Sequence, residues 1–134
     1  MIPSGLRIML AIAPVDMRLS FDGLARLVVE SLGEDPRAAS SLFVLVNAKR
    51  DRLKVLWRDK TGWCLLYKRL DENVVVLPEN VAAGATSVTV DARALARLLD
   101  GAPPSRGETM HDIAKKSRAA ALSKIESELT NPGA

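Results

Sequence analysis

The sequence predicts an α+β fold in which a small, mostly antiparallel β-sheet carries helices and a C-terminal helical extension. Short apolar segments rich in Val and Leu alternate with polar residues at the period of a strand, and two other segments show the period of a helix. The chain has 134 residues, of which 48% are hydrophobic. This length suits one domain with a modest core. The expected order is strand, helix, three-stranded meander, short strands and helix.

The first strand is expected in residues 6–13 and ends before Pro14, which cannot donate a ladder hydrogen bond. Arg7 followed by an apolar run also imitates a secretory signal with an A-x-A cleavage site. That run is shorter than an ordinary signal core, so a strand is the favoured interpretation. No apolar run in the sequence approaches the length that crosses a bilayer, and we expect a cytoplasmic protein.

A helix is expected after Ser20, which can cap its N-terminus, and it should end at Gly33 in the left-handed conformation. Side chains at helical spacing would place one stripe against the sheet, made of Phe21, Leu24, Leu27, Val28, Ser31 and Leu32.

Residues 42–70 contain three apolar segments separated by two turns, centred on residues 49–50 and 60–61. This pattern predicts an antiparallel three-stranded meander. Two further short segments, residues 74–77 and 87–90, are expected to extend or flank the same sheet.

The second helix is expected at residues 92–100, where Asp91 provides an N-cap and Gly101 a stop. The proline pair that follows marks the expected boundary. We therefore predict an α+β domain over residues 1–101, then a linker and helical extension over residues 102–134. The Ala-, Lys- and Glu-rich residues 106–129 would form that extension's helix.

Positive charge is concentrated in the meander. Eight of the nineteen Lys and Arg residues lie in residues 42–70, against only Asp51 and Asp59. The segment therefore carries a net charge of +6, while the whole chain carries only +3 and the remainder is slightly acidic. Cations placed within the expected strands favour an anionic partner.

Strand alternation assigns these cations to a face of the sheet. If the second turn has two or four residues, Arg58 lies opposite Trp63, and stepping by twos pairs Lys54 with Tyr67 and Arg52 with Arg69. These residues would share one face with Leu56 and Leu65, whereas the other face would be an apolar core surface that includes Val55, Trp57, Cys64 and Leu66. A loop of odd length would break this alignment.

Such a face predicts a platform for DNA or RNA. Arg52 opposite Arg69 costs about 0.2–1 kcal/mol unless an anion lies between them, and aromatic rings among cations can stack on bases. The candidate binding residues are Lys49, Arg50, Arg52, Lys54, Arg58, Lys60, Trp63, Tyr67, Lys68 and Arg69. Alternatively, the cations only keep a wetted sheet face soluble, and Trp63 and Tyr67 pack under the C-terminal helix.

Signals for catalysis or metal binding are weak, so we expect no enzyme, cofactor or metal. The carboxylates of Asp16, Asp22, Asp51, Asp59 and Asp71 have no spacing that forces them to converge on a metal ion. Cys64 and His111 are the only residues of their types, which excludes an internal disulfide and argues against zinc. Neither GxxxxGK[ST] nor GxGxxG is present.

Several blocks in order resemble the TnpB or Orf2-like accessory proteins of the bacterial insertion-sequence family numbered sixty-six, which are distinct from the RNA-guided nuclease also named TnpB. The resemblance covers residues 3–101. The blocks are Asp16-Met17-Arg18, Phe21-Asp22-Gly23-Leu24, Leu42-Phe43-Val44, Arg50-Asp51-Arg52-Leu53-Lys54, Trp57, Gly62 and Tyr67-Lys68-Arg69-Leu70. The chain departs from the family pattern at three places. Ser41 stands where the family usually has a Gly, Lys60-Thr61 replaces a Gly-containing turn, and Val76-Leu77-Pro78 replaces an aromatic-Trp-Pro pattern.

The resemblance implies a non-catalytic accessory role in DNA transposition beside a separate DDE-type transposase. It carries over no catalytic residue. Together with the meander, it leads us to expect binding to DNA, at transposon ends or non-specifically. The alternative is an adaptor that docks on the transposase without binding DNA, and the sequence leaves self-association open.

Overall fold

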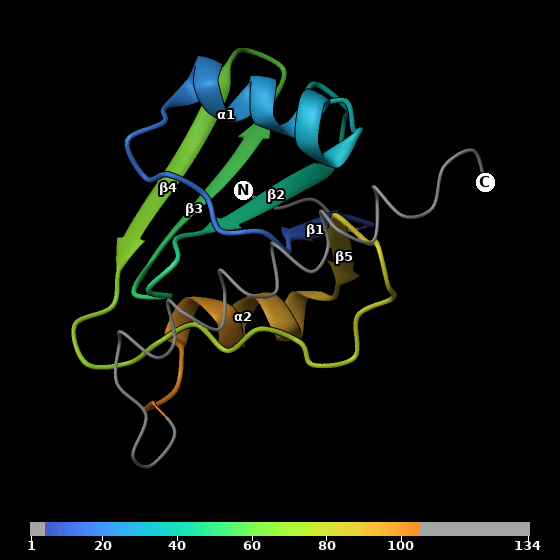
Figure 1. Ribbon diagram of the computed structural model, residues 1–134. Helices are drawn as coiled ribbons and strands as arrows, with labels where there is room; N and C mark the ends of the chain where they lie inside the picture. Colours follow the sequence, from blue (N-terminus) through green and yellow to red (C-terminus); the bar gives the residue numbers. More distant parts are fainter. Residues whose placement is uncertain (1–4, 105–134) are drawn as a thin grey trace.

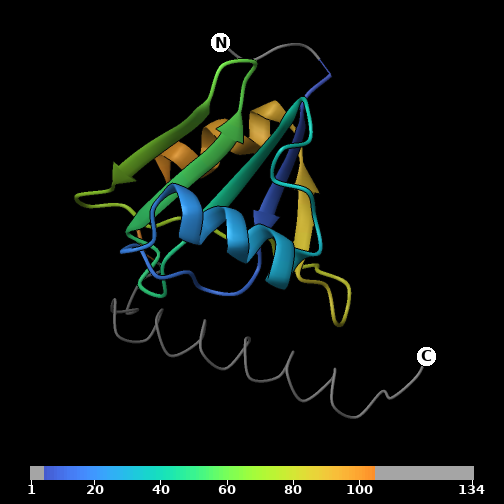
Figure 2. The ribbon, with the colours of Figure 1, turned by 90° about the horizontal axis from the view of Figure 1, so that it is seen from above.

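The computed structural model describes residues 5–104 as a five-stranded sheet between two helical layers. Figure 1 shows α1 on one side of the sheet and α2 on the other, and the view in Figure 2 agrees. The α+β fold class is thereby confirmed. The helix expected in residues 106–129, together with His111, lies outside the described residues.

The strands follow the order β4-β3-β2-β1-β5 across the sheet. β1 and β2 are parallel neighbours linked through α1, and every other pair is antiparallel. The predicted meander of β2, β3 and β4 is confirmed. The strand bounds are β1 Arg7–Ala11, β2 Ser41–Val46, β3 Arg52–Arg58, β4 Trp63–Arg69 and β5 Ser87–Val90.

The two further short segments have different outcomes. β5 is a strand, and it pairs with β1 at the sheet edge opposite β4. Residues 74–77 do not form a strand: Val74 makes an isolated bridge with Ala102, and the Val75 N–H donates to the Arg50 carbonyl oxygen over 2.7 Å. That segment closes the end of the meander instead of extending it.

The first helix is α1, Phe21–Leu27, and it continues as one turn of π-helix, η1, Val28–Leu32. The chain leaves at Gly33 with φ 65°, the left-handed value that the sequence predicts. Ser20 occupies the N-cap position, but its side chain makes no capping hydrogen bond, so its predicted capping role is wrong. Leu24 and Val28 are fully buried, whereas Phe21 is exposed.

The second helix, α2, Ala92–Asp100, has the ends that the sequence predicts. The Asp91 carboxylate accepts a hydrogen bond from the Ala94 N–H over 2.7 Å. Gly101 has φ 65°, and a Cβ atom there would lie 2.7 Å from the Val74 carbonyl oxygen. Glycine is therefore required both by the backbone conformation and by the approach of the neighbouring chain.

Each face of the sheet carries its own apolar cluster. On the α2 face the buried residues are Ile8, Leu10, Leu42, Val44, Val46, Leu53, Val55, Leu70, Val75, Leu95 and Leu98. On the α1 face they are Met9, Ala11, Val15, Leu24, Val28, Phe43, Leu45 and Leu56. The expectation that one meander face buries while the other meets solvent is therefore wrong, because α1 covers part of the face that bears the cations.

Candidate nucleic-acid interface

The predicted pairing of β3 with β4 is confirmed. Arg52 lies opposite Arg69, Lys54 opposite Tyr67, and Arg58 opposite Trp63. The loop between the strands has four residues, the even length on which the alignment depends. The cations assigned to one face therefore share it, but their surroundings differ along the strand.

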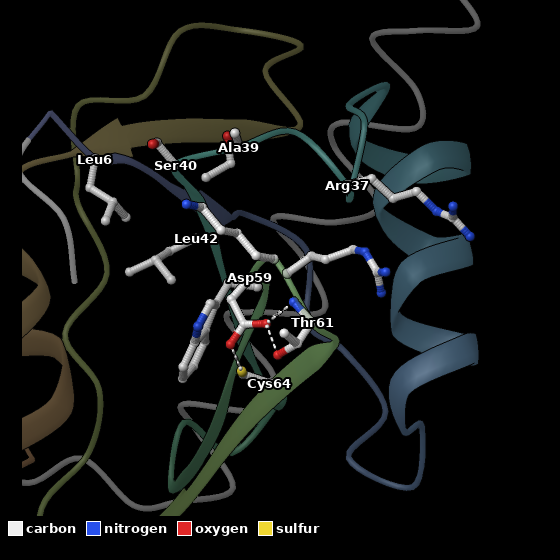
Figure 3. Close-up of a pocket in the computed structure, with 12 residues that line it drawn as sticks. Leu6, Arg37, Ala39, Ser40, Leu42, Asp59, Thr61 and Cys64 are labelled. Carbon is white, nitrogen blue, oxygen red and sulfur yellow. Dashed lines mark hydrogen bonds between the residues drawn. The ribbon is translucent and has the colours of Figure 1, made fainter. Parts of the chain in front are cut away.

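The loop takes this shape because Asp59 organises it. Its Oδ1 atom accepts hydrogen bonds from the Thr61 backbone N–H at 2.8 Å and the Thr61 hydroxyl at 3.1 Å (Figure 3). It also accepts one from the Gly62 backbone N–H at 2.9 Å. These donors lower the pKa of the Asp59 carboxyl. An Asx-type turn thus replaces the Gly-containing turn of the family pattern.

Three residues at the open end of the hairpin form what we call the arginine patch: Arg52, Tyr67 and Arg69. The Arg52 Nη1 atom donates to the Tyr67 hydroxyl over 3.4 Å, and the Arg69 Nε atom lies 3.6 Å from the Asp71 carboxylate. Both arginines are exposed, and the Tyr67 residue is 50% exposed. With Asp71 they line an open depression of about 470 Å³, which can receive an anionic group.

Lys54 shares the face of the arginine patch but is only 5% exposed. Its ammonium donates to the Met17 carbonyl oxygen over 2.8 Å and to the Leu19 carbonyl oxygen over 2.6 Å. It also lies 4.6 Å from the centre of the Tyr67 ring. The platform was expected to present this cation to a ligand. In the structure, Lys54 instead anchors the loop that enters α1.

The Asp16-Met17-Arg18 block shapes that loop. The Asp16 carboxylate accepts from the Arg18 backbone N–H at 2.9 Å and from the Arg18 guanidinium at 2.8 Å. The Arg18 side chain is the main cause that lowers the pKa of Asp16 to about 2. The turn directs the Met17 and Leu19 carbonyl groups at Lys54, so the block has a structural role as a turn that enters α1.

The remaining candidate residues are distributed around the hairpin. The Arg58 guanidinium lies 5.3 Å from the centre of the Trp63 ring, and Trp63 packs against the α1-face cluster. Lys68 lies on the opposite face, with its ammonium 4.0 Å from the Asp100 carboxylate. Lys49 and Lys60 are exposed in the two turns. Arg50 has φ 58° and serves the first turn through its backbone.

A second feature lies at the closed end of the hairpin, and we call it the turn pocket. It is a cavity of about 810 Å³. Figure 3 shows that its walls come from the residue before β1, the segment that leads into β2, and the β3–β4 turn. The residues that line it are Leu6, Arg37, Ala39, Ser40, Ser41, Leu42, Trp57, Arg58, Asp59, Lys60, Thr61 and Cys64. Sequence reasoning missed Arg37 because it comes from a loop distant in the chain.

The acidic and thiol side chains of the described residues do not gather into a metal-binding cluster. Within residues 5–104, no group of three or more His, Cys, Asp or Glu side chains could hold a metal ion. Burial and the neighbouring Asp59 carboxylate raise the pKa of the Cys64 thiol, which disfavours the reactive thiolate. Among the same residues, no helix has both the length and the apolar character that a membrane crossing requires.

Comparison with known proteins places the chain in a family. The model of the family described as "IS66 Orf2 like protein" matches residues 6–109. The chain is 37% identical over 103 residues to the uncharacterized protein y4hO of Sinorhizobium fredii, a match that covers 75% of this chain and 86% of that protein. It is 38% identical over 74 residues to the uncharacterized protein y4jC of the same organism, covering 55% and 62% of the two chains. No solved structure matches. The chain therefore belongs to the IS66 Orf2-like family of transposition-associated accessory proteins.

Proposed function

We propose that the protein binds DNA through the arginine patch as an accessory to a separate DDE-type transposase. The observation that carries the proposal is the pairing of Arg52 with Arg69 directly across the β3–β4 ladder, with both residues exposed. Family membership supplies the setting of transposition. The patch supplies a chemical reason for contact with a phosphate backbone.

Two guanidinium groups in this arrangement are unfavourable without an anion. Like charges directly opposed on a sheet cost about 0.2–1 kcal/mol. Among residues 5–104, Lys68 forms an ion pair with Asp100 and Arg69 forms one with Asp71, whereas Arg52 forms none. A phosphate between the two guanidinium groups would replace this repulsion with charge-assisted hydrogen bonds.

Tyr67 adds a neutral donor and an aromatic surface to the patch. Its hydroxyl accepts from Arg52, and its ring lies over the Lys54 ammonium. These contacts hold the ring in place beside the two arginines. Contacts to phosphate and sugar of this kind position a protein on DNA without reading its sequence, so we expect mainly non-specific binding.

The test measures fluorescence anisotropy of a labelled transposon-end duplex over a series of salt concentrations. The wild-type chain should bind more weakly as salt rises, and the double variant Arg52→Ala/Arg69→Ala should reduce the slope of log K against log salt by about two. Arg93→Ala on α2 is the matched control, since it removes an exposed cation from the other side of the sheet. Equal slopes for the double variant and the wild type would refute the proposal.

The adaptor function has one observation in its favour. β4 is an edge strand, and Leu66 on it is 38% exposed. An exposed edge with an apolar side chain can pair with a strand of another protein. Its test is co-purification of the transposase with the Leu66→Glu variant and with a chain ended after Pro104, which keeps the bridge between Val74 and Ala102. Unchanged recovery with both variants would exclude docking through this edge or the C-terminal extension.

A further inference from the structure

We propose that the turn pocket holds an unpaired nucleobase, so that the protein recognises a single-stranded overhang next to the duplex bound by the arginine patch. This inference rests on the proposed DNA binding and deepens it. It assigns a ligand to a cavity that the duplex-binding patch does not use.

The size and lining of the turn pocket suit a flat aromatic ligand. Its volume of about 810 Å³ lies within the range of small-molecule sites. Leu6, Leu42 and the partly exposed Trp57 provide apolar surface inside it. An unpaired nucleobase is a flat aromatic group whose π-faces stack on such side chains, and tryptophan offers the largest stacking surface.

The charges around the turn pocket suit the phosphates on either side of that base. Arg58 and Lys60 contribute two cations, and Arg37 adds a third at the rim, where its side chain points away from the other lining residues (Figure 3). The one carboxylate that lines the turn pocket, Asp59, already accepts three hydrogen bonds on Oδ1. It accepts a weaker one from the Cys64 thiol on Oδ2 (Figure 3). An apolar peptide would use the interior but leave these cations without a counter-charge. A nucleotide would contact the apolar interior through its base and the cations through its phosphates.

The two sites lie on one continuous element. Arg52 begins β3 and Arg58 ends it, six residues later, which corresponds to about 20 Å along the strand. This length equals about six steps of duplex DNA at 3.4 Å each. The apolar side chains of Leu42 and Trp57 in the turn pocket belong to the α2 face, whereas the arginine patch lies on the α1 face. A single strand that leaves a duplex end at the arginine patch would therefore pass around the edge strand β4 to reach the turn pocket.

The experiment compares three labelled probes of the same duplex by anisotropy at fixed salt: blunt, with a short single-stranded thymidine overhang, and with an abasic overhang of equal length. The wild type should bind the thymidine overhang about tenfold more tightly than the blunt duplex, as expected for one stacked base. The abasic overhang should lose most of this gain, because its phosphates remain but its bases are gone.

Two variants separate the pocket from the patch. Trp57→Leu removes the aromatic surface and keeps an apolar side chain toward the α2-face cluster, which Trp57 packs against. It should abolish the preference for the thymidine overhang while leaving affinity for blunt duplex unchanged. Lys60→Ala changes only an exposed turn residue, so it tests the pocket with little risk to folding. It should weaken binding of both overhang probes by severalfold. Circular dichroism confirms that each variant is folded.

The outcomes distinguish the two proposals. If blunt and overhang probes bind equally and Arg52 and Arg69 are still required, the pocket assignment is wrong and the duplex-binding proposal stands. If no probe binds, both fail. A preference that persists for the abasic overhang, or in folded Trp57→Leu, would also overturn the pocket assignment. If an apolar peptide of the transposase competes for the turn pocket while the oligonucleotides do not, the occupant is a protein segment and the assignment is overturned.

Discussion

The two faces of the sheet are covered by helices of similar length but are held by different forces. Against α2, eleven buried apolar residues form one cluster with no charge among them. Against α1, the cluster has eight apolar residues, and beside it the Lys54 ammonium binds two backbone carbonyl groups of the entering loop. Apolar burial is non-directional, whereas a charged hydrogen bond fixes position. The position of the α1 layer therefore depends on the Lys54 side chain, whereas the α2 layer is held by apolar packing.

The largest expected effect comes from removing that side chain's charge. Lys54→Met keeps the apolar stem but leaves the Met17 and Leu19 carbonyl groups without their donor, and we expect the free energy of unfolding to fall by about 3 kcal/mol. Arg52→Ala, two residues away on the same face, is the control and should change it by less than about 0.5 kcal/mol. Urea denaturation measures both. Similar small losses in the two variants would mean that the α1 layer does not depend on this anchor.

The helix N-termini give the next largest contrast. Asp91→Ala should lower the free energy of unfolding by about 1 kcal/mol, because the Asp91 carboxylate caps α2. Ser20→Ala at the corresponding position of α1 should have almost no effect, since the Ser20 side chain makes no capping bond. Thermal unfolding of the two variants side by side is the measurement. A loss in Ser20→Ala as large as in Asp91→Ala would show that α1 is capped in solution.

A smaller effect is expected at the arginine patch itself. Arg52→Glu would face Arg69 with the opposite charge and should raise the free energy of unfolding by about 0.5 kcal/mol, while it weakens DNA binding more than Arg52→Ala does. The stability gain should disappear in about 1 M salt, where screening acts over roughly 3 Å. Urea denaturation at low and high salt checks this. A variant less stable than wild type at low salt would contradict the assumed repulsion.

The smallest effect concerns the loop that Lys54 anchors. The Asp16 pKa is about 2 in the fold against an ordinary value of 3.8, so the stabilisation that it contributes is complete above about pH 4 and is lost as pH falls toward 2. Because Asp16 is at the surface, we expect only a slight drop in melting temperature for Asp16→Asn at neutral pH. The difference from wild type should vanish between pH 4 and 2. A difference that grows on acidification would contradict the role of the ion pair with Arg18.

Local chemistry made much of this architecture predictable. The alternation of side chains along the strands and the even length of the β3–β4 loop predicted that Arg52 lies opposite Arg69. Asp91 and Gly101 predicted the two ends of α2. The burial of Lys54 was not predictable, since it depends on carbonyl groups that arrive from residues 17 and 19, far away in sequence. The turn pocket was missed for the same reason. Periodicity assigns a side chain to a face, but only the neighbouring elements decide whether that face is covered.

Because the Lys54 ammonium is buried, its chemical modification can be used to measure local opening of the fold. Amine-reactive reagents should modify the exposed Lys49 and Lys60 quickly in the folded protein, whereas Lys54 stays protected by its two carbonyl partners. Its rate of modification then measures how often the loop before α1 detaches. Labelling with and without DNA would show whether DNA bound to the hairpin stabilises the α1 layer without contacting it.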